Sequence, residues 1–426
     1  MSFKKSLKAV SFLWLGSILG SGSTFVIYII LAREIGPSSF GIFSSAIATT
    51  MIFSLLAGFG VAQSWLKIFG EEGWSGIRWV KPSLYFVVLT LAIITVFLAV
   101  FSKLPFQDAV TSRILLVLTL HMYGFIAIEL VTSKLQLEEG YVNMTIWKLL
   151  PNLLRLISIL ISVFILGIEL DVYKIAFIYA FVGVLSLLIS LPHFLKMIEG
   201  DFGLKGHGNK KQVQNNIVKI SDVLKESWPF GLATLFAFIY VQSDIIMVKY
   251  LAGDEQAGYY NVGYVILTAI LLIPSILFGK FLLPKYHRWA NQDKPKFYKV
   301  YKLSNILMLI LGILAMLFIL IGSETFIILV FGIEYYDSIV LMNILAFCVP
   351  ISFLTYSFGA VLVTRKHMRL KVVFMGSVAV FNILANLLLI PKFGPKGAAL
   401  ATVGSNILLM ALYFWGAKKR VFVKGF

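Results

Sequence analysis

Arg155 is the residue whose position most directly suggests chemistry. It lies near the middle of an apolar stretch, residues 147–167, that is long enough to cross a bilayer as a helix, which takes about 20 residues. A charge at that depth costs roughly 2.5–3.5 kcal/mol on insertion scales. Because a guanidinium binds phosphate oxygens in a planar fork, we interpret Arg155 as a phosphate ligand in a polar cavity. The alternative is an ion pair with an acid that only holds helices together.

Four further residues are assigned to the same region. Asn152 precedes Arg155 by three residues and shares its helix face. Pro151 removes a helix hydrogen bond and predicts a kink toward the cavity. His121 and Tyr123 lie in the middle of the preceding apolar segment. We predict that both bind substrate, His121 as a second cationic or proton-responsive group, with a neutral hydrogen-bonded helix contact as the alternative.

Acidic residues within the apolar segments are candidates for coupling or gating. Asp244 could bind H⁺ or Na⁺ in a coupling step, or it could pair with Lys249 or Arg33 and close an outer gate. Glu129 lies about two helical turns from His121. We favour pairing of Glu129 with a basic residue over binding of a coupling ion.

The elements that position these residues must be membrane-spanning helices. The 426 residues are 59% hydrophobic and 13% charged, with a mean hydropathy of +0.91, which excludes a soluble protein with a water-facing surface. The apolar runs are continuous rather than alternating, which excludes a β-barrel. The net charge of +17 comes from Lys and Arg in loops, as expected of cytoplasmic loops, so we predict no nucleic-acid partner.

Motifs of soluble enzymes are absent from the sequence. It contains no Walker A motif, no His/Cys spacing typical of zinc sites and no Gly-x-Ser-x-Gly elbow. The single cysteine, Cys348, lies in an apolar run and is interpreted as core packing. We therefore predict a protein that is not an enzyme and has no metal or cofactor, apart from the H⁺ or Na⁺ that Asp244 would bind.

The hydropathy pattern predicts an all-α polytopic membrane protein with about twelve spans. With the N-terminus in the cytoplasm, most of the 37 basic residues fall on the cytoplasmic side. An even number of spans places both termini there. The predicted spans are residues 9–33, 40–66, 79–102, 112–134, 144–168, 172–196, 222–250, 258–284, 298–321, 337–364, 367–390 and 396–417.

A long polar stretch divides the predicted spans into two sets of six. Glycine and lysine in residues 199–221 are typical of a solvated linker. The sequence thus predicts an N-terminal six-helix lobe at 1–197, a cytoplasmic linker at 198–221 and a C-terminal six-helix lobe at 222–426. We expect the two lobes to enclose a central cavity.

The turns between spans repeat from lobe to lobe. Gly36 and Gly41 frame the turn between the first two spans, Gly253 and Gly258 frame the corresponding turn of the second lobe, and residues 393–399 form a third variant. Both paired turns have the same predicted sidedness, so the repeat is parallel. We interpret the first glycine of each pair as ending a helix and the second as allowing close helix approach.

These turns resemble the signatures of a known family. The first is Leu-Ala-Arg-Glu-Ile-Gly-Pro-Ser-Ser-Phe-Gly at 31–41, the second is Asp-Ile-Ile-Met-Val at 244–248 with Ala-Gly-Tyr-Tyr at 257–260, and the third runs from Asn386 to Ala399. With the length and span count, they resemble the polysaccharide transporter family, the O-antigen flippases of the multidrug/oligosaccharidyl-lipid/polysaccharide (MOP) superfamily. The related lipid II flippases usually have more spans than predicted here.

The resemblance implies a transporter in a bacterial inner membrane. It would move a polyprenyl-diphosphate-linked oligosaccharide, such as an O-antigen repeat unit, from the cytoplasmic to the outer leaflet by alternating access, with polysaccharide assembly proteins as further partners. A cation-coupled multidrug antiporter of the same superfamily is the main alternative, and it predicts acids deep in the first lobe. A membrane glycosyltransferase or polymerase is a third, which the short predicted outer loops disfavour.

Overall fold

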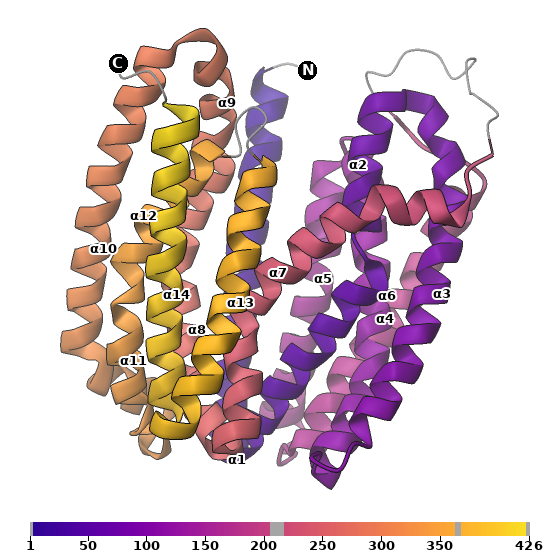
Figure 1. The fold of residues 1–426 in the computed structure, drawn as a ribbon. Coiled ribbons are helices and arrows are strands. Elements are labelled where there is room, and N and C mark those ends of the chain that lie inside the picture. The colour runs from indigo at the N-terminus through magenta and orange to yellow at the C-terminus, as the bar shows by residue number, and fades with distance from the viewer. Residues whose placement is uncertain (1–2, 205–216, 363–367, 423–426) are drawn as a thin grey trace. The chain divides into compact units, whose positions relative to one another are not determined.

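The computed structural model describes residues 3–204, 217–362 and 368–422 (Figure 1). The fold is 91% helical, and the described residues contain no strand. This confirms the predicted all-α class. Ten helical segments of the described chain are long and apolar enough to cross a membrane. The first of these, Trp14–Ser102, is 89 residues long and contains more than one helix; the count of twelve spans stays a prediction.

Helices follow one another through short turns. The helices of the first half are α1 (Phe3–Gly58), α2 (Val61–Glu72), η1 (Gly73–Gly76), α3 (Ile77–Ser102), α4 (Ala109–Leu137), α5 (Tyr141–Leu160), η2 (Ile161–Ile165) and α6 (Val172–Ile198). Those of the second half are α7 (Ile220–Ala252), α8 (Asp254–Ile276), η3 (Leu277–Leu282), α9 (Leu283–Gln292), α10 (Lys294–Phe331), η4 (Ile333–Tyr335), α11 (Ser338–Ala346), α12 (Cys348–Leu362), α13 (Met368–Phe393), α14 (Pro395–Gly416) and η5 (Ala417–Val421).

The chain packs as two compact units that exchange short segments. The first unit comprises residues 1–27 and 46–235, and the second comprises residues 28–45 and 236–426. Residues 28–45 of α1 therefore pack with helices of the second half of the chain. The predicted lobe limits at residues 197 and 222 stay a prediction, and residues 205–216 of the predicted linker lie outside the described part of the chain.

Glycines set the close helix contacts inside the first unit. A Cβ added at Gly124 of α4 would lie 2.3 Å from the carbonyl oxygen of Gly183 on α6, so these two helices approach backbone to backbone. A Cβ at Gly16 of α1 would lie 2.1 Å from the Cγ2 of Thr145 on α5. These contacts hold α4 between α5 and α6 in position.

Two of the repeated turns have the same backbone conformation. Gly36 interrupts α1 with φ 70° and ψ 173°, and Gly253 separates α7 from α8 with φ 107° and ψ 167°. L-residues with a side chain rarely adopt such positive φ values, so both positions require glycine. In each turn a new helix begins directly after the glycine.

Candidate functional site

The first polar cluster surrounds Arg155 in the first unit. Arg155 is half-buried on α5. Its Nη1 donates to the Oδ1 of Asn152, 3.3 Å away and three residues earlier on the same helix. Its Nη2 lies 3.2 Å from the Nδ1 of His121 on α4. The predicted substrate-binding residues Arg155, Asn152 and His121 thus lie together.

The contact with Arg155 defines the state of His121. An arginine side chain can only donate hydrogen bonds, so the Nδ1 of His121 must accept the bond from Nη2. The imidazole is then neutral and carries its proton on Nε2. Of the two predicted roles of His121, this geometry matches the neutral hydrogen-bonded contact, because a second cation would face the guanidinium at 3.2 Å.

Tyr179 of α6 completes this cluster. The Cζ of Arg155 lies 4.6 Å from the centroid of the Tyr179 ring, and the ring of His121 meets the same tyrosine edge-on, with centroids 5.6 Å apart. The quadrupole of an aromatic face attracts a cation at this distance. An amide, a neutral imidazole and an aromatic ring therefore orient the guanidinium, and none of these three groups neutralises its charge.

Two residues predicted to act with Arg155 have other roles in the structure. The hydroxyl of Tyr123 lies 2.8 Å from the Oγ1 of Thr95 on α3, away from the Arg155 cluster. Two residues separate His121 from Tyr123, so the two side chains leave α4 in different directions. Pro151 is buried within α5, which is helical from Tyr141 to Leu160, and a π-helical turn follows at Ile161–Ile165.

Glu129 lies further along α4 and interacts electrostatically with Lys148 of α5. In the part of the chain that the structure describes, Glu129 forms no ion pair within 4.0 Å. The predicted pairing with a basic residue is thus present only as a longer-range attraction.

The second polar cluster surrounds Asp244 on α7 in the second unit. Asp244 is 1% exposed. Its Oδ1 accepts a hydrogen bond of 2.6 Å from the Nδ2 of Asn386 on α13. Its Oδ2 accepts bonds from the hydroxyl of Tyr260 on α8 at 2.9 Å and from the hydroxyl of Thr402 on α14 at 2.5 Å. Four helices thus contribute to one buried carboxylate site.

Amide oxygens add to the acceptors around this carboxylate. The Oδ1 of Asn386 is buried, and no hydrogen-bond donor contacts it in the described part of the chain. The Oδ1 of Asn382 accepts from Ser243 at 2.9 Å and from Asn386 at 3.2 Å. A buried acceptor without a donor is costly. This site is therefore rich in oxygens that a small cation could contact.

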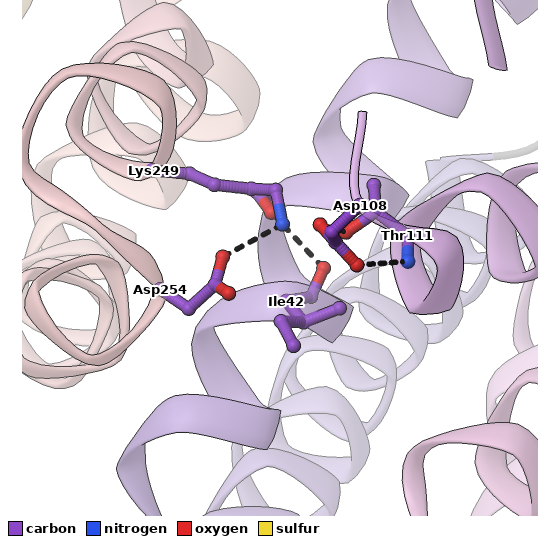
Figure 2. A network of polar contacts seen from close by, with 6 residues as sticks. Ile42, Asp108, Thr111, Lys249 and Asp254 are labelled. Carbon is purple, nitrogen blue, oxygen red and sulfur yellow. Dashed lines mark hydrogen bonds and ion pairs between the residues drawn. The ribbon is translucent and has the colours of Figure 1, made fainter. Parts of the chain in front are cut away.

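The predicted partners of Asp244 are engaged elsewhere. The Nζ of Lys249 lies 2.7 Å from the Oδ1 of Asp254, and the lysine side chain is only 4% exposed. Figure 2 shows the same ammonium directed toward the backbone of Ile42. The Nε of Arg33 donates to the carbonyl of Val330 at 2.7 Å, in the last turn of α10. The alternative in which Asp244 pairs with Lys249 or Arg33 is not the observed arrangement.

The glycines Gly41 and Gly258 lie at a close contact between the two repeated turns. A Cβ at Gly41 would lie 1.8 Å from the carbonyl oxygen of Asp254, and a Cβ at Gly258 would lie 2.0 Å from the carbonyl oxygen of Pro37. Each glycine thus faces the first helical turn after the other break. No side chain larger than hydrogen fits at either position without moving the backbone.

Three residues of the two clusters were not identified from the sequence: Tyr179, Tyr260 and Thr402. A signal for Tyr179 exists in the spacing of small residues. Gly124 follows His121 by three residues and Gly183 follows Tyr179 by four, so a contact between these two glycines brings His121 and Tyr179 together. No comparable pattern marks Tyr260 or Thr402.

Comparisons with known proteins agree on a family. A family model described as "Polysaccharide biosynthesis protein" matches residues 6–289. The capsular polysaccharide biosynthesis protein CapF of Staphylococcus aureus is 21% identical over 434 residues, which cover 98% of this chain and 100% of CapF.

Solved structures are similar over almost the whole chain. The lipid II flippase MurJ in an inward closed conformation matches with a TM-score of 0.70 and 16% identity, over 97% of this chain and 87% of MurJ. An inward-facing multidrug resistance MATE family transporter of the MOP superfamily matches with a TM-score of 0.70 and 14% identity, over 97% and 98% of the two chains. This chain therefore has the MOP transporter fold, which confirms the resemblance inferred from the turn sequences.

Proposed function

Because this chain belongs to the polysaccharide biosynthesis protein family, we propose that it transports a polyprenyl-diphosphate-linked oligosaccharide across a bacterial inner membrane. Transport runs from the cytoplasmic to the outer leaflet by alternating access, and both termini are cytoplasmic. The MOP transporter fold supports a transport role. The observation that carries the choice of substrate is the Arg155 cluster.

The cluster suits a diphosphate because it presents an oriented cation. Asn152 and His121 each contact one of the two terminal nitrogens of Arg155, and the Tyr179 ring contacts the guanidinium carbon. Such a preorganised guanidinium loses little conformational entropy when it binds a phosphate. In this proposal the diphosphate contacts Arg155 while the polyprenyl chain stays in the lipid.

The Asp244 cluster supplies the proposed coupling step. A buried carboxylate that four helices surround, beside the acceptor oxygen of Asn386, is suited to binding H⁺ or Na⁺. Because α7, α8, α13 and α14 all contribute to the site, a cation bound there changes the contacts among these helices. The binding energy of the cation would thereby shift the conformational equilibrium of the transporter.

Reconstituted transport tests the proposal. Purified protein is placed in liposomes that contain a fluorescent polyprenyl-diphosphate oligosaccharide, and translocation is measured as access of the glycan to an added glycosidase. We expect translocation well above that of protein-free liposomes, and competition by a soluble polyprenyl diphosphate analogue stronger than by the monophosphate. Translocation equal to that of empty liposomes would overturn the proposed function.

The same liposomes test the second candidate function. The match to a MATE family transporter and the buried Asp244 favour a cation-coupled drug antiporter as that candidate. Uptake of a cationic fluorescent drug against a Na⁺ or H⁺ gradient, without glycan translocation, would establish it instead.

A further inference from the structure

The two repeated turns contact each other inside the second unit. Helical backbone begins after Gly36 and after Gly253, and the two new helices cross five residues later, at Gly41 and Gly258. An added Cβ at Gly41 would lie 1.8 Å from Asp254, and one at Gly258 would lie 2.0 Å from Pro37. The contact is reciprocal and is made by main-chain atoms.

Residues 28–45, which we call the docking arm, carry the first of these turns. Both neighbouring parts of the chain, residues 1–27 and residues after 46, pack with the first unit, while the arm packs with residues 236–426. The break at Gly36 lies in the middle of the arm. The arm is thus a short segment of one unit that docks onto the other set of helices.

A few polar contacts hold the docked arm. Arg33 donates to the carbonyls of Leu329 and Val330, which lie in the last turn of α10, where carbonyls lack helical partners and a cation is favoured. The hydroxyl of Tyr335 donates to the carbonyl of Ala32 at 2.9 Å.

Two further contacts lie beyond the break. The Nδ2 of Asn261 donates to the Oγ of Ser44 at 2.8 Å, and both residues are buried. Lys249 pairs with Asp254 next to the backbone of Ile42 (Figure 2). The polar contacts thus flank the glycine crossing on both sides.

Contacts of this kind can separate without repacking a core. The glycine crossing contains no interlocking side chains, so the two helices can part without any change of rotamer. Water can replace the partners of Arg33 and of the last carbonyls of α10. The docked state is therefore specific in geometry and easily reversed.

We propose that the docking arm is the outer gate of the transporter, closed by the reciprocal contact of Gly41 and Gly258 and opened when residues 28–45 leave residues 236–426. The inference rests on the proposed function, because it identifies the part of the transport cycle that the two repeated turns perform. It assigns the repeated glycines a role in gating rather than only in chain reversal.

A labelling experiment tests the gate without reference to the substrate. Cys348 is replaced by Ser, and Ser44→Cys is introduced as the single reporter thiol, at a position only 5% exposed. A membrane-impermeant maleimide is then added outside intact cells. Gly258→Ala forces a Cβ against Pro37, so we expect labelling to become about 5- to 30-fold faster. Gly322→Ala on α10, where an added Cβ meets nothing within 4 Å, should leave the rate unchanged.

A cross-linking experiment tests whether the gate must open during transport. Ser44→Cys with Asn261→Cys joins the arm to α8, in a pair whose side chains contact at 2.8 Å. Ser323→Cys with Asn343→Cys is the matched control, a serine–asparagine pair also at 2.8 Å that joins α10 to α11. With a short thiol cross-linker we expect loss of transport in the first pair, full recovery with reductant, and no effect in the control.

The outcomes separate the gate from the proposed function. Unchanged labelling in folded Gly258→Ala protein, or full transport with the arm cross-linked, would overturn the gate. If the uncross-linked protein translocates no glycan, the proposed function fails, while faster labelling of Ser44→Cys in the Gly258→Ala variant would still establish a gate.

Discussion

The two polar clusters differ in charge and in the way that charge is supported. The Arg155 cluster contains a half-buried cation whose described contacts are with a neutral amide, a neutral imidazole and an aromatic face. The Asp244 cluster contains a fully buried carboxylate that accepts three hydrogen bonds. The first is oriented but not neutralised by these contacts, and the second is saturated with donors.

This difference teaches that the two units are prepared for opposite ligands. A guanidinium surrounded by neutral groups attracts an anion, whereas a carboxylate surrounded by hydroxyl and amide groups can exchange these donors for a cation. In a coupled transporter the anionic cargo and the driving cation need separate sites. The predictions below test this division, beginning with the largest expected effect.

Arg155→Ala should weaken binding of a soluble polyprenyl diphosphate analogue about 10- to 100-fold, because a charge-assisted hydrogen bond contributes roughly 1.5–3 kcal/mol. Titration of the purified protein measures this. Arg155→Lys keeps the charge but loses the planar fork and should lie between the two. Arg113→Ala, at an exposed arginine on α4, is the control. Equal binding by wild type and Arg155→Ala would remove the first half of the comparison.

Asp244→Asn should abolish the response of transport to an imposed Na⁺ or H⁺ gradient and lower gradient-driven transport about tenfold. The reason is that the amide cannot bind a cation electrostatically and cannot accept at both oxygens. Transport in liposomes with and without each gradient measures this, and it also identifies the ion. Binding of the diphosphate analogue should be unchanged without a gradient. A variant that still follows the gradient would show that coupling resides elsewhere.

His121→Phe should weaken binding of the same analogue about 3- to 10-fold, because the Nη2 of Arg155 then loses the acceptor that orients it. His121→Gln retains an acceptor and should restore most of the affinity. If the two variants bind alike, the imidazole acts as packing and does not position Arg155.

Tyr179→Leu should have the smallest effect, about 2- to 5-fold weaker binding, since a cation–π contact contributes about 0.5–2 kcal/mol. Tyr179→Phe keeps the aromatic face and should bind like the wild type. The contrast between leucine and phenylalanine isolates the contribution of the ring. An equal loss in both variants would instead point to the phenolic hydroxyl.

Local features of the fold could be read from the sequence. The helical class and the polytopic pattern follow from continuous apolar runs, and the positions of Gly36 and Gly253 follow from a repeat that only glycine conformations satisfy. The shared face of Asn152 and Arg155 follows from helical spacing. In each case the cause lies within a few residues of the effect.

Contacts between distant residues could not be read in this way. His121 lies 34 residues from Arg155, and Tyr123 was grouped with His121 although it contacts Thr95 on another helix. Thr402 lies 158 residues from Asp244. In a chain with 18 tyrosines and 36 phenylalanines, no single aromatic residue stands out. Only the packing of the helices selects these partners.

The exchange of residues 28–45 has a consequence for the birth of the protein. Arg33 and its acceptor Val330 are 297 residues apart, which is roughly 15–60 s of synthesis at 5–20 residues per second. During that interval the first helices are in the membrane while their docking site does not yet exist. A nascent chain that stops before α10 therefore exposes an unsatisfied arginine and a bare glycine surface, which marks it as unfinished to the cell's quality-control proteases.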